Sequence, residues 1–289
     1  MILVTGATGH LGQSVVKQLQ QHVALDQFAV LARNPSKAQG YIEQGLRVVY
    51  ADFNQPETLH AAFQNVDKLL LISTMEQNRF EQHKNVIDAA QAAGVQHVLY
   101  TSLSIQNIQT SAVKDLMISH FQTEDYLKAS GLTYTILRNT MYAEAIPQII
   151  GEQALVQGIT ITGGEGKVPY ALRAELGEAA ANALMQAGHE NKTYELVGSQ
   201  AYSYQDIAAL LTKIAQQDVQ YRPLDATAYR EYLQQQGLAD FFMYLTHGTV
   251  SDIQQHQYQV ESDDLTMLLG RNTAPLENYL NHIYAGRLT

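Results

Sequence analysis

Three glycines near the N-terminus, Gly6, Gly9 and Gly12, recur every third residue between a short apolar run and a segment with helical periodicity. In a strand–loop–helix unit, such glycines allow a tight turn, a close approach of backbone to phosphate, and packing of the helix on the strand. The helix N-terminus then presents free N–H groups and the positive end of a dipole. The spacing therefore predicts a loop that binds the pyrophosphate of a dinucleotide. The predicted contacts are Gly6, Thr8, Gly9, His10, Leu11 and Gly12.

The residues after the second apolar run indicate which dinucleotide binds. An NAD-binding site usually has an Asp or Glu there, which accepts hydrogen bonds from the adenosine ribose. This chain has no acidic residue between Asp26 and Glu43, and it has Arg33 and Lys37 instead. Arginine binds phosphate oxygens in a bidentate manner, and lysine acts as a point charge. Solvated surface cations are the alternative, but the pattern favours binding of the 2′-phosphate of NADP(H).

Further polar residues follow the third and fourth apolar runs. Asp52 can accept from the adenine amino group, with Phe53 against the ring. A turn or helix cap before Pro56 explains Asp52 equally well. Ser73 and Thr74 are expected to line the cofactor groove.

These residues need a framework of strands and helices to bring them together. Runs of four to six apolar residues with helical segments between them indicate parallel strands covered on both faces. The repeated β-α order predicts an α/β fold with a Rossmann-type doubly wound parallel sheet. The predicted strands are residues 1–4, 28–31, 46–50, 68–72, 97–101 and 133–137, with a connecting helix at Gln82–Ala93.

The pattern changes after Arg138. Strand signals become sparse, at 159–161 and 194–197, and helical segments dominate from Tyr204 onward. We therefore predict an NADP(H)-binding Rossmann domain at 1–140 and a smaller, mostly helical substrate-binding lobe at 141–289, with some of its segments returning to the sheet. The lobe is expected to cover the carboxyl edge of the sheet, where ligands of open α/β sheets bind.

Composition narrows the class of protein. A net charge of −10 argues against a nonspecific nucleic-acid binder. The chain has no cysteine, which excludes disulfides and thiolate chemistry, and its histidines show no convincing ligand spacing, so no metal is expected. No apolar run approaches the ~20 residues that span a membrane, and the N-terminus does not resemble a secretory signal. We expect a cytoplasmic protein with no membrane partner; the oligomeric state is left open, with a homodimer as one option.

Five segments carry a family resemblance: Val4–Gly12, Ala32–Asn34, His120–Glu124, Gly131–Asn139 and Gly188–Tyr194. Together they resemble the atypical short-chain dehydrogenase/reductases of the NmrA-like branch, over nearly the whole chain. Within this branch the chain looks most similar to the NADPH quinone oxidoreductases and triphenylmethane-dye reductases of bacteria. The resemblance implies an NADPH-bound Rossmann domain, a small C-terminal lobe, and a cleft for a flat conjugated acceptor such as a quinone or dye.

The chain departs from the wider family at the catalytic centre. Typical members use Tyr-x-x-x-Lys, in which the lysine lowers the pKa of the tyrosine. No tyrosine in this chain is followed four residues later by lysine, and the family's helix places Leu116 at the tyrosine position and His120 at the lysine position. Alcohol–ketone interconversion is therefore disfavoured. Quinone reduction tolerates the absence, because its product anion is delocalised and water can protonate it.

Several side chains are candidates for the acceptor side of the site. His120 is a candidate proton donor or nicotinamide-ribose contact, or else a packed helix histidine capped by Glu124. Ser102 and Ser104 lie where the family places a catalytic hydroxyl, although either can cap the next helix.

The segment after the sixth strand adds two more candidates. Tyr142 can stack on an aromatic acceptor, and Asn139 can hold an amide or carbonyl as a cofactor contact. The aromatic run at 241–244 is of a kind that lies in a core more often than in a pocket.

The sequence thus predicts an NADPH-dependent oxidoreductase that transfers hydride to a quinone or similar conjugated electrophile, with His120, Ser102 and Tyr142 as catalytic candidates. The alternative is an NmrA-type redox-sensing regulator that binds NADP(H) and a protein partner without turnover, which the missing Tyr-x-x-x-Lys motivates. An epimerase or dehydratase ranks last, because such enzymes mostly keep the tyrosine.

Overall fold

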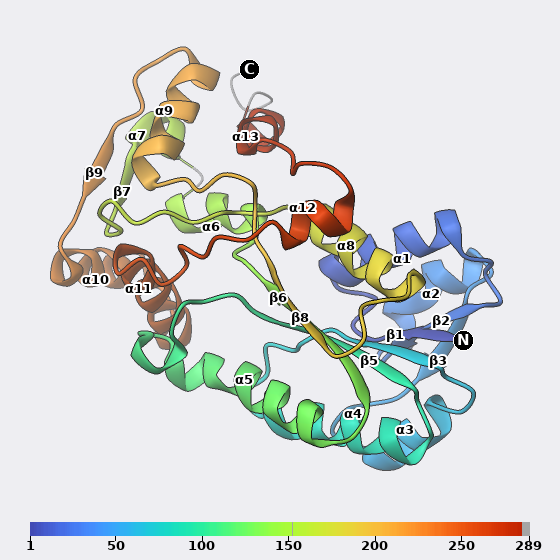
Figure 1. The fold of residues 1–289 in the computed structure, drawn as a ribbon. Coiled ribbons are helices and arrows are strands. Elements are labelled where there is room, and N and C mark those ends of the chain that lie inside the picture. The colour runs from blue at the N-terminus through green and yellow to red at the C-terminus, as the bar shows by residue number, and fades with distance from the viewer. Residues whose placement is uncertain (152, 285–289) are drawn as a thin grey trace.

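A seven-stranded, fully parallel sheet forms the centre of the computed structural model, which describes residues 1–151 and 153–284 (Figure 1). The strand order is β3-β2-β1-β4-β5-β6-β8, so the chain reverses direction across the sheet between β1 and β4. This order confirms the predicted doubly wound fold. The strands are β1 (Ile2–Val4), β2 (Phe28–Ala32), β3 (Arg47–Tyr50), β4 (Lys68–Leu71), β5 (His97–Leu103), β6 (Thr133–Asn139) and β8 (Lys192–Leu196).

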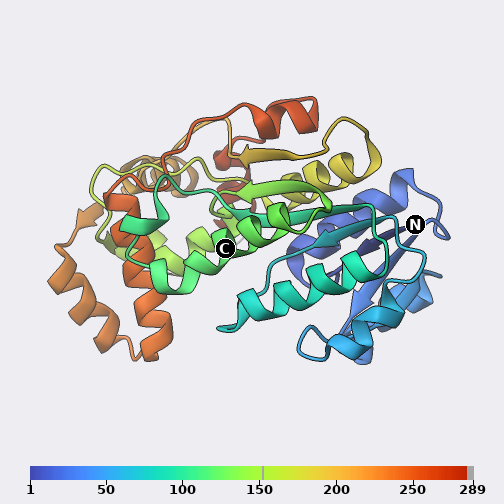
Figure 2. The ribbon, with the colours of Figure 1, turned by 60° about the horizontal axis from the view of Figure 1, so that its bottom comes forward.

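Helices cover both faces of this sheet (Figure 2). Successive strand residues point to opposite faces, so Leu70 and Leu99 pack toward one set of helices while Leu69 and Val98 pack toward the other. The first set is α1 (His10–His22), α2 (Pro35–Glu43), α8 (Arg173–Met185) and α12 (Asp264–Leu269). The second set is α3 (Pro56–Ala62), α4 (Arg79–Ala92) and α5 (Lys114–Ala129).

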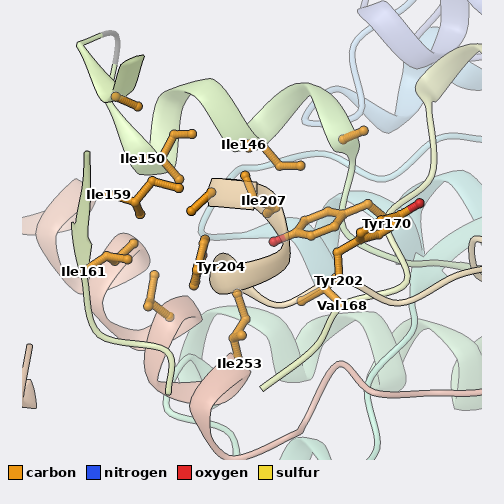
Figure 3. Packing of buried hydrophobic residues seen from close by; sticks show 14 of the residues in the cluster. Ile146, Ile150, Ile159, Ile161, Val168, Tyr170, Tyr202, Tyr204, Ile207 and Ile253 are labelled. Carbon is orange, nitrogen blue, oxygen red and sulfur yellow. The ribbon is translucent and has the colours of Figure 1, made fainter. Parts of the chain in front are cut away.

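Most of the other described residues build a lobe beside the carboxyl edge of the sheet, with its own core. Six buried tyrosines share this core with isoleucines and leucines. Figure 3 shows part of it, with Tyr170, Tyr202 and Tyr204 among isoleucines. Its elements are η2 (Ala143–Ala145), α6 (Ile146–Ile150), α7 (Ala154–Gln157), β7 (Ile159–Ile161), α9 (Tyr204–Ala215), β9 (Tyr221–Pro223), α10 (Ala226–Gln235), α11 (Asp240–Gln254) and α13 (Leu276–Tyr284). The six tyrosines are Tyr170, Tyr202, Tyr204, Tyr229, Tyr258 and Tyr284.

The lobe and the sheet are joined where α11 meets the segment between η1 (Ile108–Thr110) and α5. The buried carboxylate of Asp252 accepts from the Ser111 hydroxyl at 2.6 Å and from the Ala112 N–H at 2.7 Å. A Cβ on Gly248 would lie 2.6 Å from a methyl group of Val113, so only glycine permits this close approach. Segments from beyond residue 140 also return to the sheet, because β8 pairs with β6 and α8 packs on α1.

Several predicted boundaries differ from the observed ones. β5 runs to Leu103 and β6 to Asn139, so both strands are longer than their apolar runs. Ser102 therefore lies inside β5 and not after it, which corrects the prediction. The short β9, which pairs with β7 in a second, two-stranded sheet, was missed because three residues carry no usable periodicity. Phe241 and Phe242 are 37% and 59% exposed at the start of α11, so they do not belong to the core.

Candidate functional site

The glycine loop has the geometry that a phosphate-binding turn requires. Gly6 has a φ of +60°, in the left-handed region that side chains disfavour, and its carbonyl accepts from the Gly9 N–H at 3.0 Å. A Cβ on Gly12 would lie 2.2 Å from the Gly6 oxygen. Gly9 is the N-cap of α1 and has no side chain to occupy the first-turn N–H groups, which remain open to a ligand.

A cavity of about 180 Å³ lies beside this loop and brings several predicted contacts together. It extends from the phosphate loop across the ends of β2, β3 and β4. Five lining residues were not among the predicted contacts, and they are Leu31, Ala32, Ala51, Glu76 and Gln82. Lys37 is not among the lining residues; it lies exposed in the first turn of α2. The lining residues are Gly6, Thr8, Leu31, Ala32, Arg33, Ala51, Asp52, Phe53, Thr74, Glu76 and Gln82.

Arg33 and Glu76 face each other in this cavity. The Arg33 Nη1 lies 3.8 Å from the Glu76 Oε1, and both side chains are more than half exposed. Asp52 lines the cavity and also accepts from the Asn54 N–H at 2.9 Å in a local turn, so the turn role is observed and the adenine contact stays a prediction. The cavity therefore contains one cation and two carboxylates.

The loop between β4 and α4 is held by hydrogen bonds on both sides. The Ser73 N–H donates to the Thr101 hydroxyl at 2.9 Å, and the Thr74 hydroxyl donates to the Gln82 side chain at 2.8 Å. The Thr74 N–H donates to Nε2 of His83 at 3.3 Å. These bonds fix the loop that carries Thr74, one of the residues lining the cavity.

His120 lies inside the protein, between α5 and β5. Its Nδ1 is 3.0 Å from the hydroxyl of Tyr100, and the side chain is 6% exposed. Burial, together with the positive charge of Arg79, holds the pKa of His120 well below its usual value. The imidazole is therefore neutral near pH 7, and its observed partner is Tyr100 and not Glu124.

Glu124 instead belongs to a buried ionic network with Ser102. It accepts from the Ser102 hydroxyl at 2.7 Å and from two nitrogens of Arg138 at 2.8 and 2.7 Å. Arg138 also donates to Glu195 at 2.9 Å. The Ser102 proton is thus already engaged, which disfavours Ser102 as the catalytic hydroxyl. Ser104 is buried just beyond β5, and its Oγ has no hydrogen-bond partner among the described residues.

Asn139 and Tyr142 come together at the carboxyl end of β6. Burial raises the pKa of Tyr142 above its usual value. A hydrogen bond with the Asn139 side chain and the positive charge of Arg173 lower this pKa, but by less. The Arg173 guanidinium lies 4.2 Å from the ring centroid of Tyr142 and pairs with Glu144 at 3.5 Å. Arg173 therefore covers one face of the Tyr142 ring.

Two kinds of site find no support in the described part of the chain. No three His, Cys, Asp or Glu side chains gather there in a way that could hold a metal ion. None of the described helices combines the length and apolar character needed to cross a bilayer.

Residues 6–186 match a family model described as NAD(P)H-binding. This span contains the glycine loop, the cavity and α5. The chain belongs to the NAD(P)H-binding family.

Individual proteins resemble the chain over almost its full length. Quinone oxidoreductase 2 of Escherichia coli is 37% identical, over 98% of this chain and 99% of that protein. The crystal structure of NADPH-dependent quinone oxidoreductase from Escherichia coli, complexed with NADPH, matches 98% of this chain and all of that one with a TM-score of 0.90. The triphenylmethane reductase of Citrobacter sp., complexed with NADP(H), is 33% identical and matches 98% of this chain and 99% of that one, also with a TM-score of 0.90.

Proposed function

We propose that this protein is an NADPH-dependent reductase that transfers hydride to a quinone or a similar conjugated electrophile. The main support is the combination of an open phosphate-binding loop with a full-length similarity to a quinone oxidoreductase. The same similarity disfavours a regulator without turnover. A dye is the second acceptor class, because the triphenylmethane reductase is similar over the same length.

The residues present fit NADP(H). The free N–H groups at the start of α1 suit the pyrophosphate. Because Gly12 has no Cβ, α1 packs directly against the Gly6 carbonyl and the loop keeps its conformation. Arg33, in the cavity beyond Thr8, would hold the 2′-phosphate, with Phe53 beside the adenine. Asn139 would contact the nicotinamide end, at the carboxyl edge of the sheet. When bound, NADPH supplies the hydride.

On the acceptor side, the chain's own groups chiefly position the reactants. His120 is buried and neutral, and the Ser102 hydroxyl is bonded to Glu124, so neither is poised to donate a proton. We assign Tyr142 to acceptor stacking through the ring face opposite Arg173, and the Ser104 hydroxyl, which has no partner among the described residues, to hydrogen bonding with the acceptor oxygen. Holding the nicotinamide ring and the acceptor ring in the right relative position is sufficient for hydride transfer when the anion of the reduced acceptor is delocalised.

The test follows the absorbance of reduced nicotinamide with a small panel of quinones and cationic dyes. The proposal predicts acceptor-dependent oxidation of NADPH. Binding of NADPH without oxidation by any member of the panel would contradict the proposal and favour a sensor.

A further inference from the structure

Arg79 is a fully buried arginine at the wall of the proposed cofactor groove. Its side chain is 0% exposed. It donates to the carbonyl oxygen of Thr74, to that of Leu116 at 3.0 Å, and to the Ser119 hydroxyl at 2.9 Å. The guanidinium thus links the loop after β4 with α5.

The positive charge of Arg79 has no counter-charge nearby. No carboxylate of the described residues lies within ion-pair distance of it. It is also the first residue of α4, where the helix dipole disfavours a cation. Buried charges are normally paired, because removing an ion from water without a partner is costly. The stability of the fold therefore does not explain why a cation stands here.

The titratable groups around Arg79 supply no negative charge either. Burial and the field of Arg79 lower the pKa of His83 to about 3 and also lower that of His120, so both are neutral. Burial raises the pKa of Tyr100, which keeps its phenol protonated. Glu124 is already paired with Arg138 and Lys128. Glu76 and Glu81 lie within three residues of Arg79 in the chain, but neither forms an ion pair with it, so the guanidinium has no direct counter-charge among the described residues.

The guanidinium of Arg79 lies directly behind a residue that lines the proposed cofactor groove. Thr74, whose carbonyl Arg79 holds, lines the cavity together with Gly6 and Thr8 of the phosphate loop. A dinucleotide phosphate brings several negative charges to this wall. The chain itself has a net charge of −10, so an anionic ligand needs local positive charge to bind.

We propose that Arg79 is the internal counter-charge of the bound dinucleotide. It is a positioning residue, because it acts from behind the Thr74 backbone without touching the ligand, and its field is weakly screened since the guanidinium is buried. This inference rests on the proposed binding of NADP(H). Arg79 thus has two separable roles. The acceptors on Leu116 and Ser119 need only a hydrogen-bond donor, whereas the bound phosphates need a positive charge.

The test compares two variants. Arg79→Met removes the charge at similar volume, and Arg79→Lys keeps the charge but loses the several N–H donors of the guanidinium. The dissociation constant of NADPH is measured by the fluorescence of reduced nicotinamide, and the melting temperature by circular dichroism. We expect Arg79→Met to weaken binding about tenfold or more and Arg79→Lys to stay within about threefold. The melting temperature of Arg79→Met should fall, because methionine leaves the carbonyl oxygens of Thr74 and Leu116 without their donor, so both dissociation constants are measured at a temperature where the variants are folded.

The control is Arg222→Met, which removes the same charge from an exposed position in β9 and should leave the dissociation constant unchanged. Wild-type affinity in Arg79→Met would overturn the inference, and so would a loss of tenfold or more in folded Arg79→Lys. The Lys variant decides the matter if the Met variant does not fold. Failure of the wild-type protein to bind NADPH would instead overturn the proposed function.

Discussion

Arg33 and Glu76 reach the same cavity from two different loops, one after β2 and one after β4. Their 3.8 Å separation and high exposure make them a weak pair, which contributes little to stability. A 2′-phosphate offers Arg33 a stronger, bidentate partner than Glu76 does. The pair therefore matters more for the choice of cofactor than for the fold.

We predict that Arg33→Ala raises the KM for NADPH by about ten- to a hundredfold and changes the KM for NADH little, because only NADPH has the 2′-phosphate. Steady-state kinetics with both cofactors measures this. Lys37→Ala is the matched control and should have a smaller effect, since Lys37 lies outside the cavity lining. Equal changes for the two cofactors would contradict the assignment.

The sequence predicts the place of some site residues in the cavity but gives no sign of others. Gly6, Thr8, Arg33 and Thr74 line the observed cavity because each lies within four residues of the end of a strand, and the fold places such positions at one edge. Arg79 stands in a helix and has no local pattern of its own. Its importance depends on burial, which only the packed structure determines.

Among the elements, the turn from β1 into α1 depends most on the absence of side chains. The contact between Gly12 and the Gly6 carbonyl leaves no room for a Cβ. Gly40, in α2, is a useful contrast, because nothing lies within 4 Å of a Cβ built there.

We predict that Gly12→Ala displaces the glycine loop, destabilises the protein by about 1–3 kcal/mol and weakens NADPH binding by tenfold or more. Gly40→Ala should leave binding unchanged and raise stability by about 0.5–1 kcal/mol, as alanine favours a helix interior. Urea unfolding and fluorescence titration test both variants. Normal NADPH affinity in Gly12→Ala would show that the loop tolerates displacement.

The packing of α5 on β5 and β6 depends on Glu124, which is 1% exposed and bonded to Ser102 and Arg138. Glu124→Ala should lower the free energy of unfolding by about 3 kcal/mol, because it leaves a partly buried guanidinium with one fewer partner. Asp88→Ala, which breaks an exposed pair with Lys84, should cost far less. Similar losses in the two variants would argue against a special role for the network.

For the molecule as a whole, buried histidines make stability depend on pH. His83, His97, His120 and His189 are all buried, and all four have a lowered pKa, chiefly because of burial. Below their usual pKa of about 6.5, the unfolded chain binds protons that the folded chain does not. Stability therefore falls as the pH drops below this value.

We predict that the free energy of unfolding in urea decreases between pH 7 and pH 5, with His83 contributing up to about 1.4 kcal/mol per pH unit below its unfolded pKa. The loss from His83 should continue toward its folded pKa of about 3. His83→Gln should flatten the dependence, whereas His60→Gln, at an exposed position, should not. A flat profile in the wild-type protein would contradict the neutral, buried state of these imidazoles.

The two parts of the molecule also differ in how well sequence predicts them. The strands through β6 follow apolar runs, so their order of appearance and approximate positions were predicted correctly. In the lobe, β9 and the tyrosine core have no such periodicity, because they form by contacts between distant segments. The division at residue 140 stays a prediction.

The concentration of tyrosine in the lobe has a spectroscopic consequence. The chain has 17 tyrosines and no tryptophan, and six of the tyrosines lie buried in the lobe core. Near-ultraviolet dichroism therefore reports largely on the lobe, while the far-ultraviolet signal follows the helices and the sheet. Without tryptophan emission to obscure it, energy transfer from tyrosine to a bound reduced nicotinamide becomes a direct optical signal of cofactor occupancy.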